Sequence, residues 1–125
     1  MARVLAFVPD LLFGSNVQGS LSAAGDQVEL IGDAPRLRER LSTPDDPPAD
    51  VLIVDLTDAQ LDGAAVLESL AERDLLGAIK TLAFYSHVDA DTGERARAAG
   101  FDLVVPRSRM AREGPALVKR LAEGD

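Results

Sequence analysis

The run Val51-Leu52-Ile53-Val54-Asp55 decides the fold, because four consecutive apolar residues lead directly to an acid. A short continuous apolar run, rich in β-branched residues, is typical of a strand buried on both faces of a parallel sheet. Four other runs share enough of this character to be interpreted as strands. The complete set of predicted strands is Arg3–Val8, Gln27–Gly32, Asp50–Asp55, Ile79–Tyr85 and Asp102–Val105.

Segments with helical periodicity separate these runs. The predicted helices are Ser15–Ala24, Pro35–Leu41, Leu61–Arg73, Asp89–Ala99 and about Ala111–Ala122. Regular alternation of strands and helices is the pattern of repeated βαβ units, whose right-handed crossovers place helices on both faces of the sheet. The sequence therefore predicts a three-layer α/β/α sandwich around a five-stranded parallel sheet.

Capping signals agree with this division. Ser15 or Asn16 can cap the first predicted helix, because their side chains accept hydrogen bonds from free amide groups. Asp89 or Asp91 can start the fourth, and Gly100 can end it. We expect helix boundaries close to these residues.

Composition limits the classes of function. The chain has 125 residues and no cysteine, so we expect one domain, residues 1–125, without disulfides or thiolate catalysis. The formal net charge of −8 disfavours nonspecific binding to nucleic acids and anionic membranes. The apolar runs are much shorter than the roughly 20 residues that span a bilayer, and we expect a soluble, cytoplasmic protein.

Functional side chains are expected at one edge of the sheet. In open α/β sheets, ligands and catalytic groups gather outside the carboxyl ends of the strands. The residues that the predicted strands place there are Val8–Leu11, Asp33, Asp55–Asp58, Ser86–His87 and Val105–Arg107.

Several landmarks near these strand ends occur in a familiar order. Asp55 ends a hydrophobic strand, and an Asp62-Gly63 pair follows seven and eight residues later. Ser86 follows the fourth strand, Ala99-Gly100 precedes the fifth, and Arg107 lies seven residues beyond that glycine. In this order and spacing the chain resembles the receiver domains of bacterial response regulators. The resemblance covers nearly the whole chain and implies a flavodoxin-like sheet with strand order 2-1-3-4-5.

The metal-binding part of the receiver pattern is incomplete. Receivers typically carry two adjacent acids after the first strand, where this chain has Val8 and Pro9. Asp10, one residue farther on, is the acid that remains. Since Mg²⁺ requires near-octahedral oxygen coordination, Asp10 and Asp55 together predict at most a weak site. We therefore expect that the protein requires no cofactor. If it binds one, the expected cofactor is Mg²⁺.

Two further positions depart from the pattern. Arg107 stands where receivers usually have a lysine, and Ser108 follows in place of the usual proline. A planar guanidinium holds phosphate differently from a compact ammonium. Val104 stands where many receivers have a Tyr or Phe that acts as a switch. The resemblance is thus to an atypical, or pseudo-receiver, member of the family.

The resemblance implies specific roles at the sheet edge. Asp55 is the candidate phosphoacceptor, with Ser86 as a hydroxyl donor and Arg107 as a partner for phosphate oxygens. The only reaction implied is phosphoryl transfer to Asp55 itself, so the chain is not expected to be an enzyme in any other sense. The structural alternative is an ion pair between Asp55 and Arg107, and we favour that interpretation.

Other polar residues at this edge have structural explanations. Ser86 can bond nearby backbone groups, and acids such as Asp10, Asp58 and Asp62 are favourable near helix starts. His87 has no neighbouring acid motif that would suggest catalysis or metal binding. We interpret it as an incidental turn residue.

The segment Gly14–Gly19 offers a function of another class. It is expected to follow a strand and open a helix, where backbone amides can bind an anion, although it matches no nucleotide-binding motif. A small α/β ligand-binding protein using this turn is the corresponding hypothesis, and flexible helix entry is the structural alternative.

Basic residues are concentrated late in the chain. They are Arg95, Arg97, Arg107, Arg109, Arg112, Lys119 and Arg120. In a receiver-like fold the fourth helix, fifth strand and fifth helix form one surface, which could dock an acidic partner or a second copy through Arg95, Arg97, Arg109 and Arg112. The alternative is an ordinary solvated face balanced by nearby glutamates.

These observations lead to one principal functional hypothesis. It is a stand-alone signalling module of the receiver type that acts through protein contacts and depends weakly or not at all on phosphorylation. The competing hypothesis is a conventional Mg²⁺-dependent phosphoacceptor that uses Asp55 and receives its phosphoryl group from a histidine kinase. The sequence names no partner.

Overall fold

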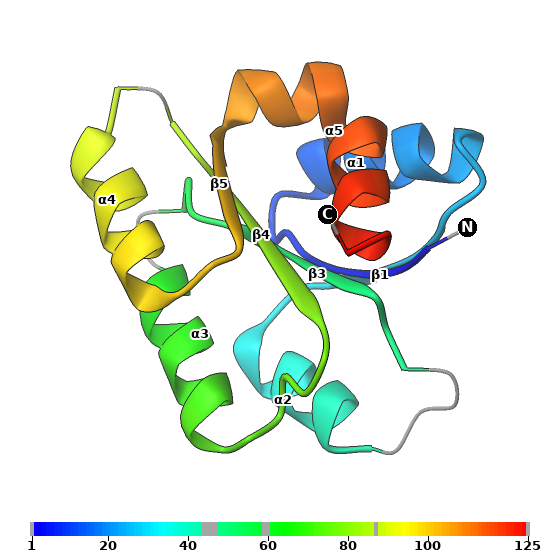
Figure 1. The fold of residues 1–125 in the computed structure, drawn as a ribbon. Coiled ribbons are helices and arrows are strands. Elements are labelled where there is room, and N and C mark those ends of the chain that lie inside the picture. The colour runs from blue at the N-terminus through cyan, green and yellow to red at the C-terminus, as the bar shows by residue number, and fades with distance from the viewer. Residues whose placement is uncertain (1, 44–47, 59–60, 87, 125) are drawn as a thin grey trace.

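The computed structural model describes residues 2–43, 48–58, 61–86 and 88–124. It contains one parallel sheet with strand order β2-β1-β3-β4-β5, which confirms the predicted topology (Figure 1). The strands are β1 (Arg3–Phe7), β2 (Gln27–Ile31), β3 (Val51–Asp55), β4 (Lys80–Tyr85) and β5 (Leu103–Pro106). The helices are α1 (Leu11–Ala23), α2 (Ala34–Ser42), α3 (Gly63–Glu72), α4 (Ala90–Ala99) and α5 (Arg107–Ala122).

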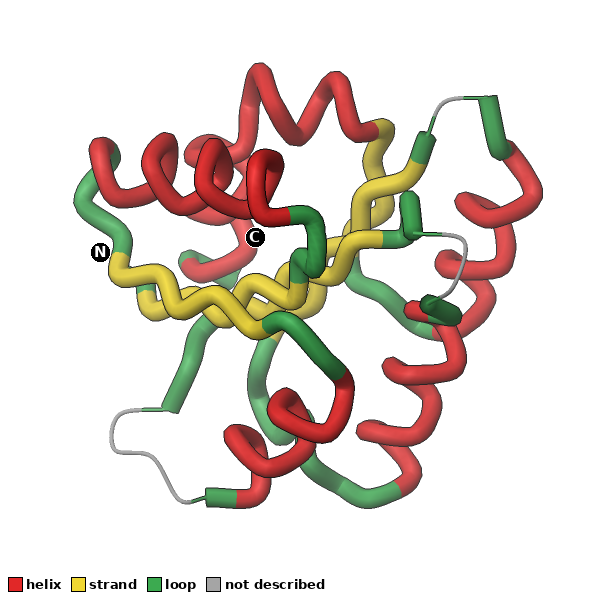
Figure 2. The backbone as a smooth tube through the Cα atoms, turned by 180° about the vertical axis from the view of Figure 1, so that it is seen from behind, coloured by secondary structure: helices red, strands yellow, loops and turns green. Residues whose placement is uncertain are grey.

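Helices cover both faces of the sheet, as expected for right-handed crossovers. Figure 1 and the reverse view in Figure 2 show α1 and α5 on one face and α2, α3 and α4 on the other. Each face has its own apolar core. Val17 of α1 and Val118 of α5 belong to one core, and Leu37 of α2 and Leu67 of α3 belong to the other. All five residues of β3 are buried, which explains its uninterrupted apolar run.

The register brings the strand ends into line. Phe7 is paired with both Ile31 and Val54, and Asp55 is paired with Phe84. The carboxyl ends of neighbouring strands therefore lie along one edge, as the sequence predicted.

The first helix begins earlier than predicted. Helix α1 starts at Leu11, and the predicted caps at Ser15 and Asn16 are wrong. Asp10 is the cap, since its Oδ1 atom accepts hydrogen bonds from the amides of Leu12 (3.0 Å) and Phe13 (3.1 Å). The sequence did not indicate this start, because Leu11 and Leu12 are apolar but exposed and do not belong to the apolar face of the helix.

This early start removes the proposed anion-binding turn. The segment Gly14–Gly19 lies inside α1, and the amide of Gly14 donates to the carbonyl of Asp10 at 2.8 Å. Gly14 is buried against the end of β1, where an added Cβ would lie 3.4 Å from the Val8 carbonyl oxygen. Amides bonded within a helix cannot cradle an anion, so the ligand-binding hypothesis for this segment is wrong.

The last helix also begins earlier than predicted. Helix α5 starts at Arg107 rather than near Ala111, and Pro106 at its cap makes no side-chain hydrogen bond to the helix. Pro115 lies inside α5, where it removes one intrahelical hydrogen bond. Figure 1 shows that α5 changes direction between its orange first half and its red second half. The sequence did not indicate the start of α5, because no capping side chain marks it and because a proline lies inside the helix.

The remaining helix starts follow ordinary capping chemistry. Asp33 accepts from the amide of Arg36 at 2.8 Å, and Asp62 accepts from that of Ala65 at 3.0 Å. Asp89 caps α4 as predicted, and Gly100 ends it with φ 110°, a conformation that favours glycine. Other predicted boundaries agree with the structure to within two residues.

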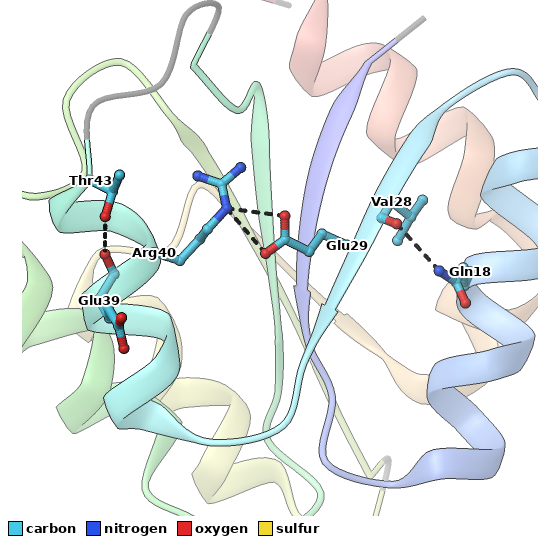
Figure 3. A network of polar contacts seen from close by, with 6 residues as sticks. All are labelled: Gln18, Val28, Glu29, Glu39, Arg40 and Thr43. Atoms are coloured by element: carbon cyan, nitrogen blue, oxygen red, sulfur yellow. Dashed lines mark hydrogen bonds and ion pairs between the residues drawn. The ribbon is translucent and has the colours of Figure 1, made fainter.

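Side chains from both helical layers fasten the edge strand β2 (Figure 3). Gln18 of α1 donates to the Val28 carbonyl at 3.3 Å. From the other layer, Nε of Arg40 in α2 donates to both carboxylate oxygens of Glu29, at 3.0 and 3.1 Å. These contacts cover part of an edge that is otherwise open to pairing with another chain. No helix in the described residues is long and apolar enough to cross a membrane.

Candidate functional site

The carboxyl edge of the sheet contains an open pocket of about 880 Å³. It brings together four of the side chains that the sequence placed at this edge, namely those of Asp10, Asp55, Ser86 and Arg107, whereas Asp33 does not line it. Its other lining residues are Pro9, Phe13, Thr57, Asp58, Ser108 and Ala111. The loop after β1, the end of β3, the end of β4 and the start of α5 therefore meet in one site.

Asp55 is the deepest acid of the pocket, with 1% of its surface exposed. Its Oδ1 atom accepts two hydrogen bonds from Thr57, one from the amide at 2.7 Å and one from the hydroxyl at 2.6 Å. Among the described residues, no group donates a hydrogen bond to its Oδ2 atom. Half of the carboxylate is thus fixed by the turn that follows β3, and the other half is left for the pocket.

Arg107 does not pair with Asp55, so the predicted ion pair is wrong. Its Nη2 atom lies 3.7 Å from Oδ2 of Asp10. Its guanidinium carbon lies 4.1 Å from the centre of the Phe13 ring, which is a close cation–π contact. The early starts of α1 and α5 explain this pairing, because they place Arg107 beside Asp10 at the mouth of the pocket.

Ser86 lies at the end of β4, as predicted, and is half-buried. Its backbone carbonyl accepts a hydrogen bond from the amide of Asp89 at 2.9 Å. Among the described residues, its hydroxyl has no protein partner, so it is free to donate into the pocket. The predicted turn residue His87 lies outside the described residues.

The residues present do not fit a preformed Mg²⁺ site. Asp10 already uses Oδ1 to cap α1 and Oδ2 to face Arg107. Val8 and Pro9 provide no carboxylate where receivers have acids, and the Val8 side chain is buried. In the part of the chain that the structure describes, no group of three or more His, Cys, Asp or Glu is placed to hold a metal ion. Mg²⁺ binding here would require Asp10 to give up existing contacts.

The roles of two site residues escaped prediction. Thr57 fixes Asp55, and the signal for it was Asp55 itself, since an aspartate side chain commonly accepts a hydrogen bond from the backbone two residues on. Phe13 supports Arg107, but the predicted first helix begins at Ser15 and leaves Phe13 outside it. Recognising Asp10 as a helix cap would have placed Phe13 in the first turn of α1, facing the sheet.

The two arginines of α4 in the predicted basic surface, Arg95 and Arg97, both contact other side chains of this chain. Arg95 pairs with Asp62 (3.0 Å) and lies 3.8 Å from Glu68 of α3, so its charge faces away from β5 and α5. Arg97 stacks over the ring of Tyr85, with the guanidinium carbon 5.8 Å from the ring centre.

Two arginines of α5, Arg109 and Arg112, share one acid. Arg109 lies 3.4 Å from a carboxylate oxygen of Glu113, and Arg112 lies 3.3 Å from the same oxygen. All three side chains are well exposed, so these pairs contribute little to stability and remain available to a partner.

Comparison of sequences gave no match, either to models of protein families or to curated proteins. Comparison of structures gave many. The receiver domain of a signal transduction histidine kinase from Syntrophus aciditrophicus has a TM-score of 0.84 at 20% identity, covering 99% of this chain and 92% of that one. A Francisella response regulator receiver domain has a TM-score of 0.83 at 15% identity, covering 98% of both chains.

A chemotaxis response regulator from Vibrio cholerae has a TM-score of 0.80 at 17% identity, covering 97% of this chain and 98% of that one. The chain has the receiver fold. Identities of 15–20% with near-complete coverage show that the receiver fold is shared from the first strand to the last helix. They leave the chemistry of the pocket to be argued from its own residues.

Proposed function

We propose that this chain is a signalling module of the receiver type whose output is contact with another protein and which works without phosphorylation of Asp55. One observation carries the proposal: Asp10, the remaining acid beside the phosphoacceptor position, is committed to the α1 cap and to Arg107. The chain has the receiver fold, but Val8 and Pro9 stand where the receiver pattern has the acids that hold a divalent ion.

The chemistry of phosphoryl transfer supports this interpretation. Transfer to a carboxylate requires cations that neutralise the charge on the phosphoryl oxygens while the carboxylate attacks. Arg107 is the only cation among the described lining residues, and it lies against Phe13 and Asp10 rather than beside Asp55. Without a second cation, attack by Asp55 would be slow.

We therefore expect no phosphorylation of Asp55 when the chain is incubated with acetyl phosphate and millimolar Mg²⁺. The measurement is intact mass spectrometry over a time course, with Asp55→Asn as the matched control. A nearly stoichiometric phosphoryl adduct on the wild-type chain, absent from the Asn variant, would refute the proposal.

A conventional Mg²⁺-dependent phosphoacceptor is the second candidate. It is favoured by the convergence of Asp10, Asp55, Ser86 and Arg107 on one pocket. In this case a histidine kinase is the partner, Arg107 swings from Asp10 toward the phosphoryl group, and Asp10 becomes a metal ligand together with Asp55.

The second candidate predicts that millimolar Mg²⁺ raises the melting temperature of the wild-type chain and that Asp10→Ala abolishes this rise. Asp10→Ala also removes a helix cap, at a cost of about 1 kcal/mol, so the Mg²⁺-induced change must be compared within each variant. Asp91→Asn, an exposed acid on α4, is the charge-matched control. An equal response to Mg²⁺ in the wild type and Asp10→Ala, or none in either, rejects the second candidate.

For the output contact, we propose the surface formed by α4, β5 and α5, which can meet an acidic partner or a second copy of the chain. Arg97, Arg109 and Arg112 provide exposed positive charge there. Arg95 is a weaker contributor, because it faces α3.

A further inference from the structure

One carboxylate oxygen of Asp55 has no hydrogen-bond donor among the described residues. Its side chain is 99% buried, and Thr57 occupies only Oδ1. Among the described residues, Oδ2 receives no hydrogen bond, although the residue lines the pocket. This oxygen therefore reaches the pocket, because no fully buried side-chain oxygen or nitrogen of the described residues lacks a hydrogen-bond partner. A charged donor in the pocket would give it a strong hydrogen bond.

The charges around the pocket specify the sign of the missing group. Asp10, Asp55 and Asp58 line the pocket with Arg107 as the one described cation. Among the described lining residues, carboxylates therefore outnumber cations, within a chain of net charge −8. Such a field attracts cations and repels phosphate or carboxylate groups.

The residues that follow Asp10 indicate which side chains a partner presents beside its cationic group. Leu11 and Leu12, which follow directly, are 83% and 75% exposed. The α1 helix that they begin contains no Asp, Glu, Lys or Arg, although charged residues make up 27% of the chain. Two adjacent exposed leucines at the uncharged start of this helix, next to a charged pocket, suit a partner that presents apolar side chains beside its charge.

We infer that the pocket binds a lysine or arginine side chain that a partner protein presents between apolar residues. The cationic group donates a hydrogen bond to Oδ2 of Asp55, and its aliphatic stem lies along Phe13 and Ala111. The flanking apolar residues cover Leu11 and Leu12. This inference rests on the proposed function, because it assigns to Asp55 the recognition of a partner in place of phosphoryl transfer.

The test uses acetyl-Leu-Lys-Leu-amide as the probe, titrated into the isotopically labelled full chain in the presence of a chelator. Two-dimensional NMR detects weak binding and locates it. We expect shifts in the amide signals of Leu12, Thr57 and Ser86, and binding at least tenfold tighter than that of acetyl-Leu-Gln-Leu-amide. Equal affinity for both peptides overturns the inference.

Variants separate the pocket from the overall charge. Asp55→Asn can still accept both Thr57 hydrogen bonds, so the fold is retained, and we expect about tenfold weaker binding of the lysine peptide because a charge-assisted hydrogen bond is lost. Asp91→Asn removes the same charge elsewhere and should bind as the wild type does. Equal weakening by both variants, or by neither, overturns the inference.

Leu12→Ser gives an independent readout, because an exposed side chain can be replaced without disturbing the core. We expect severalfold weaker binding of the lysine peptide, and an unchanged affinity contradicts the apolar half of the inference. The acetyl phosphate experiment tests the proposed function independently of the peptide titration. A phosphoryl adduct on Asp55 rejects the proposed function. Equal binding of the lysine and glutamine peptides rejects only the present inference.

Discussion

Gly63→Ala is expected to destabilise the fold by about 2 kcal/mol, because a Cβ at this position overpacks the core. The new methyl group would clash with Cδ2 of Leu56 and lie 3.0 Å from Cγ1 of Val54. Both neighbours are buried and continuous with β3, and Val54 is a stiff β-branched residue. Either the Leu56 side chain must leave its position in the core or the first residue of α3 must shift away from the strand that carries Asp55. Urea unfolding measures the change in free energy.

Gly19→Ala is the matched control, with an effect of opposite sign. Gly19 lies on the exposed side of α1, and no atom is within 4 Å of an added Cβ. Alanine there should stabilise the chain by up to about 1 kcal/mol, because it restricts the unfolded backbone and favours the helix. A Gly63→Ala variant as stable as the wild type would show that α3 does not pack on β3 as closely as described.

The sheet and the position of the site could be predicted because they depend on the apolar runs and on the order of strands and helices, and not on any single side-chain contact. Apolar runs such as Val51–Val54 have one stable environment, between two helical layers. Parallel strands joined by right-handed crossovers must then align their carboxyl ends. For this reason Asp55, Ser86 and Arg107 could be assigned to one edge from the sequence, and the structure places all three in the same pocket.

The pairing inside the pocket was not predictable on the same grounds. Arg107 has a long side chain that can reach several acids, and its choice of Asp10 depends on where two helices begin. Those starts were misjudged because Leu11 and Leu12 are apolar but exposed, and because α5 lacks a capping side chain. Local propensity is a weak guide where the tertiary structure decides the boundary.

Thr57 illustrates an intermediate case. An aspartate side chain in a turn commonly accepts a hydrogen bond from the backbone two residues on, which predicts that one carboxylate oxygen of Asp55 is held locally. The sequence cannot show that the second oxygen of Asp55 remains without a donor, because this depends on every side chain that surrounds it. The character of the pocket therefore emerges only from the packed structure.

Phe13→Ala is expected to have the largest effect, a loss of about 3–4 kcal/mol in the free energy of unfolding. The Phe13 side chain is 92% buried, and its ring centre lies 5.0 Å from that of Phe84 in the core between the sheet, α1 and α5. Alanine leaves a cavity at this point and removes the surface on which Arg107 rests. Phe13→Leu keeps most of the volume, so it should cost less than half as much. Equal losses in the two variants would show that the ring does not fill the core as described.

The cation–π contact can be separated from this packing by a double-mutant cycle that combines Phe13→Leu with Arg107→Met. Methionine keeps a flexible apolar side chain over the ring but removes the guanidinium. We expect a coupling of about 0.5–1 kcal/mol between the two positions, typical of a partly exposed cation over an aromatic face. A coupling near zero would mean that Asp10 alone positions Arg107. Because Asp10 is itself fixed as the cap of α1, the size of this coupling shows how firmly the pocket keeps its cation away from Asp55.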